Sequence, residues 1–560
     1  MQNIATFVQA TQRNSGRDMV TNHEGAPAYH RSLREQVVQV LTTGTLNDTF
    51  YASGHELAAE ASEVLVRARE QCPEFLARAL VWAREKGYMR TLPVVGLAIL
   101  SGGRGATKAL FEAAFPRVIR TPDDLRAFVA LCVAGTVPGR KGLGGVAVAA
   151  VRKSMNTLSE YHAVKYGSAA SRGVSLRDVL RLSHPHPTDA ALSERFGWLV
   201  GGVGKLGSNP ALNPRIRAFE ALKRTTDEGD CISLIRTGSL PYEAVIPALS
   251  ATTPAIWAEL LRQAPYMNLL RNLVTLTRHD VFKDEANVRY AVERLTDQRA
   301  IESAKVFPFR FMDAWRKYTG TDGHDSRIAD AIRAALEMSF VNVPSFGDLT
   351  VAVGTDVSGS MAYDYPEMGS RKPIEIAGIF TGAILRRIQG RAIPLPFETV
   401  VRQNCGLSGR DEILTTANKI AAMGGGGTAV GAPIGYLLDR KIPVDVFVGI
   451  TDNEDWAFGD GYSTPGSFRL EWQRYTREVS PRARAYLITV VPGREVVAPA
   501  GEKGVRFIYG WSDAVLKFIS QDLSSGFGQV REIESLNIGT AAGAVGGPTE
   551  ADEDAQTEEG

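Results

Sequence analysis

Residues 349–360 read Leu-Thr-Val-Ala-Val-Gly-Thr-Asp-Val-Ser-Gly-Ser, and this stretch decides the fold of the C-terminal half of the chain. Its apolar first part is typical of a buried strand, and its second part is a loop rich in side-chain oxygens. Further strand-like segments are expected at 394–402, 444–450, 483–491 and 505–509, and helix-like segments at 374–389, 411–423, 430–438, 468–478 and 513–523. This alternation predicts a doubly wound, mostly parallel sheet.

Three loops of this region carry candidate metal ligands. Asp356, Ser358 and Ser360 alternate along the loop after the first strand, so their oxygens can converge on one hard cation. Thr428 follows four consecutive glycines, and Asp452 comes directly after the strand at 444–450. Because the carboxyl ends of parallel strands meet at one edge of a sheet, we expect the five residues to bind Mg²⁺ or another divalent cation together. An Asp-x-Ser-x-Ser run taken alone is more often a turn or a helix cap.

The order of these ligands resembles the metal-ion-dependent adhesion site of the von Willebrand factor A domain. That site has an Asp-x-Ser-x-Ser loop, then a threonine, then an aspartate, and all five positions are matched here. The resemblance implies that an acidic group of a partner protein completes the shell of the ion. A metal with a purely structural role, or a site that holds no metal, is the alternative that the residues leave open.

The N-terminal part of the chain has the pattern of a helical protein. From about residue 30 to 340, apolar residues recur at helical spacing in short segments separated by Gly, Pro, Asn or Asp. We expect helices at 57–71, 74–86, 93–100, 122–134, 144–159, 176–182, 256–264, 269–277 and 327–338. Short helices in close succession favour an α-solenoid of stacked pairs, although no fixed sequence period is visible.

The charge of the chain is unevenly distributed. The net charge is +1, but residues 1–350 hold 43 Lys and Arg against 35 Asp and Glu, and residues 101–200 alone hold 14 against 7. This stretch includes Arg140, Lys141, Lys165 and Arg172, with tyrosines between them. Cations that bind phosphates, beside rings available for stacking, suit RNA. A solvated helix face is the ordinary explanation of such surface charge.

Several phrases of the helical region resemble the TROVE module of the Ro ribonucleoprotein family. They are Thr-Phe-Tyr-Ala-Ser at 49–53, Gly-Arg-Lys-Gly-Leu-Gly at 139–144, Asp-Val-Leu-Arg-Leu-Ser-His-Pro at 178–185, Leu-Leu-Arg-Asn-Leu at 269–273 and Pro-Phe-Arg-Phe at 308–311. With a von Willebrand factor A-like domain behind them, these phrases cover most of the chain. On these residues the chain is identified as a member of the Ro (TROVE) family.

This resemblance implies a ring of HEAT-like helical repeats with two RNA-binding surfaces. Y-like small noncoding RNA would bind on the basic outer surface, and single-stranded RNA ends would enter the hole of the ring. The lysine, arginine and histidine that contact RNA in the family correspond to Lys165, Arg172 and His184, beside Arg140 and Lys141. After Lys165 this sequence is two residues longer than the family pattern.

Other function classes find little support in the sequence. The four cysteines, at 72, 132, 231 and 405, are scattered, which excludes a thiolate zinc site and fits a reducing compartment. No apolar run approaches the roughly 20 residues that a bilayer crossing needs, and no secretory signal is visible. We therefore expect a cytoplasmic protein with no membrane contact.

No catalytic machinery is expected either. A Gly-x-Gly-x-x-Gly pattern at 202–207 is followed by Ser-Asn-Pro-Ala-Leu-Asn-Pro, which cannot open a helix under a pyrophosphate. Ser358 lies in no Gly-x-Ser-x-Gly elbow, and no suitably placed histidine is visible near it. The sequence thus predicts a non-enzymatic protein.

Three regions follow from these patterns. Residues 1–345 are expected to form the helical RNA-binding module, and residues 346–525 the von Willebrand factor A-like domain. Residues 526–560 are rich in Gly and Ala and then acidic, which predicts a disordered tail.

The expected function is that of an RNA-binding ribonucleoprotein component in quality control or processing of noncoding RNA. Its expected partners are Y-like RNA, misfolded or single-stranded RNA, an exoribonuclease, and an acidic residue of a partner protein at the metal site. The alternative is a metal-dependent protein-adhesion module on a helical scaffold that binds no RNA. Salt separates the two, because binding dominated by phosphate contacts weakens steeply as the salt concentration rises.

Overall fold

The computed structural model describes residues 19–21, 27–43, 54–87, 89–135, 137, 142–167, 173–304, 306, 308–340, 346–363, 372–388, 391–456, 467–491, 495–499, 502–509, 515–516, 519, 522–523 and 529–539. The expected boundary near residue 345 falls between described segments. No helix of these residues is long and apolar enough to span a bilayer.

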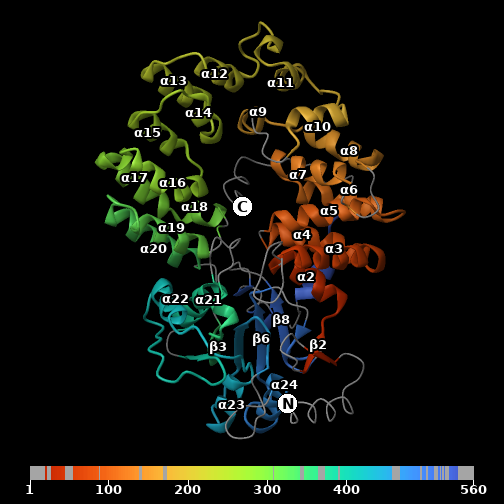
Figure 1. Ribbon diagram of the computed structural model, residues 1–560, viewed down its shortest axis with the longest axis vertical. Coiled ribbons are helices and arrows are strands. Elements are labelled where there is room, and N and C mark those ends of the chain that lie inside the picture. Colours follow the sequence, from red (N-terminus) through yellow and green to blue (C-terminus); the bar gives the residue numbers. More distant parts are fainter. Residues whose placement is uncertain are drawn as a thin grey trace.

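The helical region forms an arc with two limbs (Figure 1). The first limb contains α2 (Leu33–Thr43), α3 (Gly54–Gln71), α4 (Pro73–Glu85), α5 (Thr91–Ser101), α6 (Thr107–Val118), α7 (Pro122–Val133), α8 (Gly144–Met155), α9 (Glu160–Gly167), α10 (Leu176–Ser183), α11 (Ala190–Gly201) and η1 (Val203–Lys205). Within it α4 packs against α5 and α6, and α10 packs against α8 and α11.

The second limb returns from the top of the arc towards the C-terminal domain. It contains α12 (Pro214–Leu222), α13 (Glu228–Gly238), α14 (Tyr242–Ala248), α15 (Pro254–Gln263), α16 (Tyr266–Arg278), η2 (Val281–Lys283), α17 (Glu285–Leu295), α18 (Gln298–Ala304), α19 (Pro308–Thr319) and α20 (Ser326–Ser339). Here α12 packs against α13 and α9, and α20 packs against α17 and α19. The prediction of a mostly helical N-terminal region is confirmed.

Local signals explain why these segments start where they do. Thr121 and Asp124 form a capping box at the start of α7, and Ser175 and Asp178 form another at the start of α10. Each pair satisfies backbone N–H groups that a helix end leaves without a partner. The same polar and proline signals allowed the sequence to predict a helix from residue 122, where α7 begins.

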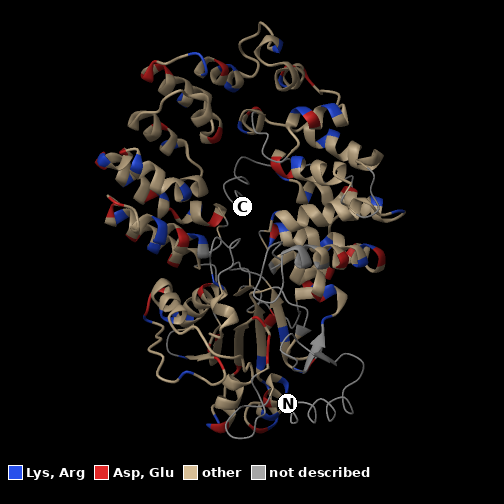
Figure 2. Cartoon of the chain, viewed as in Figure 1, with Lys and Arg blue, Asp and Glu red and all other residues tan. Residues whose placement is uncertain are grey.

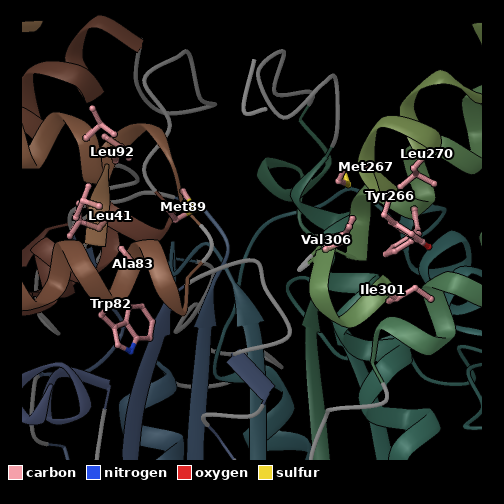
Figure 3. Close-up of a cluster of buried hydrophobic side chains, with 14 of the residues drawn as sticks. Leu41, Trp82, Ala83, Met89, Leu92, Tyr266, Met267, Leu270, Ile301 and Val306 are labelled. Carbon is pink, nitrogen blue, oxygen red and sulfur yellow. The ribbon is translucent and has the colours of Figure 1, made fainter. Parts of the chain in front are cut away.

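The apolar faces of the helices supply the buried core of both limbs. Figure 3 shows two groups of these side chains, one from the first limb and one from the second, on either side of the top of the sheet. Leu41, Trp82 and Leu92 belong to the first group, and Tyr266 and Leu270 belong to the second. All five are at most 5% exposed.

The C-terminal domain is built on a five-stranded sheet in which every pairing is parallel. Its strands are β3 (Val351–Asp356), β4 (Ala392–Phe397), β5 (Val446–Thr451), β6 (Arg484–Thr489) and β8 (Val505–Tyr509), in the spatial order β4-β3-β5-β6-β8. Between them lie η3 (Ser360–Ala362), α21 (Pro373–Ile388), α22 (Ile413–Ala421), α23 (Ala432–Asp439) and α24 (Phe468–Glu478). The predicted doubly wound sheet is confirmed.

Side chains alternate between the two faces of this sheet. Val351 and Val353 of β3 join the core that contains α21, whereas Ala352 joins the core that contains α23 and α24. Phe447 of β5 and Leu487 of β6 belong to the second core as well. Both faces are therefore covered, as the nearly continuous apolar runs of a parallel sheet require.

The C-terminal domain spans the two ends of the helical arc (Figure 1). At the second limb, α19 packs on α21 and α20 packs on α22, and Arg386 Nε lies 2.8 Å from Glu337 Oε2. At the first limb, α2 packs against β8. The ring expected from the sequence is thus completed by the sheet domain.

The first two described strands of the chain also join the helical region to the C-terminal domain, which the sequence did not indicate. Strands β1 (Met19–Thr21) and β2 (Pro27–His30) form an antiparallel sheet with β7 (Glu495–Val496). The N-terminal region assigned to the helical module therefore extends into the C-terminal domain.

The prediction of a disordered tail from residue 526 is wrong for residues 529–539. Gln529–Ser535 form α26, which packs on α2 and α4. Ile533 is fully buried, and Arg78 Nη1 donates a hydrogen bond of 2.7 Å to the Glu534 carbonyl. Val530, Ile533 and Leu536 are spaced at helical intervals and pack against the core, so their burial outweighs the Gly-rich composition around them.

Replacing Ile533 by Ala should loosen this C-terminal clamp. Truncation of a buried Ile costs about 2–5 kcal/mol, so we expect a lower thermal unfolding midpoint and faster tryptic cleavage at Arg531. The matched control is Ser535→Ala, because this side chain is exposed and its loss should change stability by no more than about 0.5 kcal/mol while Arg531 stays available to trypsin. An unchanged midpoint in the Ile533 variant would contradict the docking of α26.

Candidate functional site

The metal-ligand candidates lie at the carboxyl edge of the sheet. Asp356 is the last residue of β3, and Asp452 follows the last residue of β5. β3 and β5 are adjacent and parallel, with Thr355 opposite Ile450. This register brings two aspartates that are 96 positions apart in the sequence to the same edge.

Hydrogen bonds hold the Asp356 carboxylate in place. Ser358 N donates to Asp356 Oδ1 at 2.9 Å, and Thr451 Oγ1 donates to Asp356 Oδ2 at 2.7 Å. The first bond closes the loop on itself, and the second ties it to the end of β5. Asp356 is fully buried, so its orientation is fixed by these neighbours.

The serines connect this loop to the second aspartate. Ser358 Oγ lies 3.3 Å from Ser360 Oγ, and Ser360 Oγ donates to Asp452 Oδ2 at 2.5 Å. Glu454 N donates to the other oxygen, Asp452 Oδ1, at 3.2 Å. The structure therefore brings four of the five predicted ligands into one chain of contacts.

The Gly-rich loop packs directly against the serine loop. Gly359 N donates to the Gly426 carbonyl at 3.0 Å, and Gly425 N donates to the Val357 carbonyl at 2.9 Å. Gly426 has a φ of 91°, a conformation that favours glycine, and a Cβ there would also collide with the Glu398 carboxylate, so a larger residue would strain this loop. Thr428, the fifth predicted ligand, is 1% exposed two residues beyond this contact.

Burial of the two aspartates disfavours their ionised forms. Burial and the charge of Asp452 raise the pKa of Asp356, and burial raises the pKa of Asp452. Donated hydrogen bonds from Ser358 and Thr451 counteract this shift in Asp356 without cancelling it. Two buried carboxylates beside hydroxyl oxygens are a donor set that a hard divalent cation would neutralise.

Most of the candidate metal ligands at this edge are hydroxyl oxygens, and only two are carboxylates. Among the described residues no group of three or more His, Cys, Asp or Glu is arranged to hold a metal ion. The serine and threonine oxygens of the three loops are what make this edge a candidate cation site.

One residue that supports the site was missed by sequence analysis. Asp455 is 3% exposed, and its two oxygens accept hydrogen bonds of 2.9 Å from Val430 N and Phe468 N. Burial raises its pKa to about 7. It ties the loop after β5 to the segment that follows Thr428. The dense acidic run at 452–455 was the available signal.

The RNA-contact candidates divide into two groups. Arg140, Lys141 and Arg172 lie outside the described residues. His184 is exposed at the C-terminal end of α10, where it adopts a left-handed conformation with φ 46° and its amide donates to the Leu180 carbonyl.

Lys165 is placed differently from the exposed phosphate contact that the sequence suggested. It is 5% exposed, and its Nζ lies 3.6 Å from Glu243 Oε1. The same ammonium group lies 5.4 Å from the ring centre of Tyr161 and 5.5 Å from that of Tyr166. These neighbours occupy the charge, so Lys165 joins α9 to α14 rather than presenting a free cation.

A basic face is present beside His184 at the ends of α8 and α10. It consists of the exposed residues Arg152, Lys153, Arg177 and Arg181, and we call it the α8–α10 face. Arg152 Nε donates to the Ser183 carbonyl, which joins the two helix ends. No ion pair joins these four side chains to an acid among the described residues, although the pKa of Asp178 on the same helix is lowered by hydrogen bonds from Ser175 and by the charges of Arg181 and Arg177. Figure 2 shows basic residues around this upper part of the first limb.

Comparisons with known proteins point to one family. A family model for the TROVE domain matches residues 243–319, and a model for the Ro60 vWA domain matches residues 350–521. The chain is 30% identical over 458 residues to "RNA-binding protein RO60" of Deinococcus radiodurans, covering 78% of this chain and 84% of that protein. It is 23% identical over 530 residues to the protein of the same name in Caenorhabditis elegans, covering 78% and 80%.

A solved structure has the same fold. The crystal structure of the Deinococcus radiodurans RO (RSR) protein superposes with a TM-score of 0.66 at 22% identity. The match covers 88% of this chain and 99% of that chain. The helical region and the sheet domain are thus shared as one architecture.

The buried carboxyls should make the stability of the metal-free protein depend on pH. An acid with a raised pKa in the folded state stabilises the protein below its ordinary pKa of about 3.9, and this contribution is lost as pH rises through the folded value. Asp356, Asp452 and Asp455 all shift in this direction, the last to about 7. In EDTA, the unfolding midpoint should therefore fall as pH rises from about 4 to about 7.

Asp452→Asn removes one charge of the buried pair and should flatten this pH dependence. Asp439→Asn is the control, because Asp439 is exposed at the end of α23. Thermal unfolding followed by circular dichroism across the pH range measures the effect. If the Asp452 variant kept the full slope, the buried pair would not be its source.

Proposed function

We propose that this chain binds RNA, because it belongs to the Ro60 family, whose relatives in Deinococcus radiodurans and Caenorhabditis elegans are named RNA-binding proteins. The observation that carries the proposal in this molecule is the α8–α10 face. Its cations are exposed and form no ion pair among the described residues, so they can reach phosphates. Elsewhere on the arc, arginines such as Arg236 and Arg327 are paired with glutamates.

The finer part of the proposal concerns the RNA. Y-like noncoding RNA would bind along the α8–α10 face with His184, and Arg140, Lys141 and Arg172 of the neighbouring segments would add further phosphate contacts. Misfolded or single-stranded RNA would place an end in the opening of the arc. Lys165 would act by holding α9 against α14 near this surface.

The same proposal assigns a role in RNA quality control or processing, without catalysis by this chain. An exoribonuclease partner would degrade or trim the RNA that the arc holds. We place the protein in the cytoplasm, because its four cysteines are separate thiols, as a reducing compartment requires.

At the sheet edge we propose a Mg²⁺ site formed by Asp356, Ser358, Ser360, Thr428 and Asp452. The two buried carboxylates, with their raised pKa values, and the adjacent hydroxyls support this assignment. When bound, the ion would offer a positive coordination position to an acidic residue of a partner protein. The chain's own residues hold the loops in register for that contact.

Metal binding should depend on Asp356 but RNA binding should not. We expect Asp356→Ala to abolish Mg²⁺ uptake in isothermal titration, because it removes one of the two buried charges, while the affinity for RNA stays within about twofold. Mg²⁺ at roughly 100 times its Kd should stabilise the unmodified protein by about 2.7 kcal/mol. Undiminished heat of binding in the variant would refute the assignment.

Reversing charge on the α8–α10 face should weaken RNA binding strongly. In Lys153→Glu with Arg181→Glu we expect at least a tenfold loss of affinity for a hairpin RNA. The slope of log K against log salt, taken between about 50 and about 200 mM, should shrink in magnitude by about two. Fluorescence anisotropy provides both quantities.

The control for this experiment is Arg289→Glu with Arg299→Glu. Both arginines are exposed on the second limb, so the net charge changes equally while the α8–α10 face stays intact. Equal losses in the two double variants would mean that only the overall charge matters. If the unmodified protein binds no RNA even at low salt, the metal-dependent adhesion module becomes the better account.

A further inference from the structure

A pocket of about 580 Å³ lies where the two limbs of the arc meet. Its walls come from α9, the start of α12, the segment between α13 and α14, the end of α15, and α17. α9 of the first limb packs on α12 and α14 of the second, so the pocket lies at the junction of the two limbs. Its volume lies in the range of roughly 300–1,000 Å³ that small ligands occupy.

The wall of this junction pocket is positively charged. Arg215, Arg262 and Arg294 line it, and Glu243 is the one acidic residue among its lining residues. The Glu243 carboxylate is matched by the buried Lys165 ammonium at 3.6 Å. The three guanidinium groups therefore set the sign of the electrostatic potential inside.

Two of these arginines contact neutral groups that orient them. Arg262 Nη1 donates to Asn287 Oδ1 at 2.9 Å and lies 5.8 Å from the ring centre of Tyr290. Arg215 Nε donates to the Gly238 carbonyl at 2.9 Å and lies 5.1 Å from the ring centre of Tyr161. Carbonyls, amides and rings orient a guanidinium without cancelling its charge. Glu259, whose pKa is lowered by the hydrogen bond that Arg236 donates and by the charge of Arg262, is already bound by Arg236 at 2.6 Å.

Arg294, the third arginine of the pocket, is held less firmly than the other two. Its nearest acid is Asp297 at 3.6 Å, and both side chains are partly exposed, so solvent screens this pair. An incoming anion can compete for such a side chain at little cost. Three donors in one concave wall suit a tetrahedral oxyanion, because guanidinium groups bind phosphate in bidentate fashion.

The same pocket also presents aromatic surface. Tyr161, Tyr242 and Tyr290 line it, and all three are partly exposed. Lys165 and Arg215 already lie against the Tyr161 ring, so Tyr242 and Tyr290 are the rings on which a base would stack. Tyr290 Oη donates to the Arg262 carbonyl at 2.9 Å, which fixes its ring beside the charged wall. Rings on which a base can stack, next to arginines that hold a phosphate, are the combination that recognises a nucleotide.

We propose that the junction pocket binds one phosphorylated nucleoside, with the phosphate on Arg215, Arg262 and Arg294 and the base on the rings of Tyr242 and Tyr290. This site is separate in residues from the α8–α10 face and from the metal site. A free mononucleotide and a single nucleotide of an RNA strand share this chemistry. The second source rests on the proposed RNA-binding function, whereas the first does not.

Isothermal titration of the full chain with adenosine 5′-monophosphate and with a 5′-phosphorylated oligouridylate tests the proposal. We expect Arg262→Gln and Arg294→Gln each to weaken binding at least tenfold. Unphosphorylated adenosine should bind at least tenfold more weakly than its monophosphate. Arg289→Gln, on α17 but outside the pocket, is the matched control and should change affinity less than twofold.

The source of the nucleotide follows from which probe depends on the arginines. Binding of the monophosphate that is lost in both variants supports a free ligand, and binding of the oligouridylate alone supports a nucleotide within a strand. Thermal unfolding midpoints show whether each variant is folded, and Arg294→Gln removes only a solvent-screened pair.

Two results would overturn the inference: neither probe binds the unmodified protein, or both variants bind as well as the control. Hairpin RNA measured on the same samples separates this from the proposed function. If the hairpin binds but neither probe binds the pocket, only the junction-pocket proposal is refuted. If the monophosphate binds but no RNA does, only the RNA-binding proposal is refuted.

Discussion

Two carboxylates, Asp356 and Asp452, are buried side by side at the edge of the sheet, and the rest of the C-terminal domain is arranged around them. Their proximity is a consequence of topology, because β3 and β5 are neighbouring parallel strands whose carboxyl ends coincide. Burial of two like charges is costly unless protons or a cation neutralise them. The hydroxyls of Ser360 and Thr451 donate to these carboxylates and fix their orientation, but hydroxyls carry no charge. Hydrogen bonds therefore fix the loops of this edge, whereas neutralising its charge depends on protons or on a cation.

Much of this edge could be predicted from the sequence, because strand ends and loop residues are local signals. The apolar run before Asp356 and the one before Asp452 each predicted a strand. Because the strands of such a sheet are parallel, their carboxyl ends were expected at the same edge. Asp455 was not predicted, since its role depends on two amides, Val430 N and Phe468 N, that only the folded chain brings together. α26 was missed for a similar reason: its helix is stabilised by Ile533 packing on a distant limb, and local composition argued against it.

Charge patterns show the same division between what a sequence can and cannot indicate. Lys165 and Arg181 are both basic residues of the same positive stretch, and nothing local distinguishes them. In the folded chain Arg181 is exposed, whereas Lys165 is enclosed by tyrosines and Glu243. Whether a cation is available to a phosphate depends on partners supplied by other helices. Composition therefore predicted that the region is basic, but not which residues present the charge.

The two basic surfaces of the arc differ in how much ordering a ligand would impose. On the α8–α10 face, Lys153 is a long exposed side chain, so each phosphate contact costs roughly 0.5–1.5 kcal/mol of side-chain entropy and is screened by salt. In the junction pocket, Arg262 is already oriented by Asn287 and Tyr290, so less freedom is lost on binding. Exposed cations favour binding of a long RNA backbone regardless of its sequence, because many weak phosphate contacts add up. Oriented cations beside aromatic rings favour binding of a single nucleotide, because the side chains are already positioned before the ligand binds.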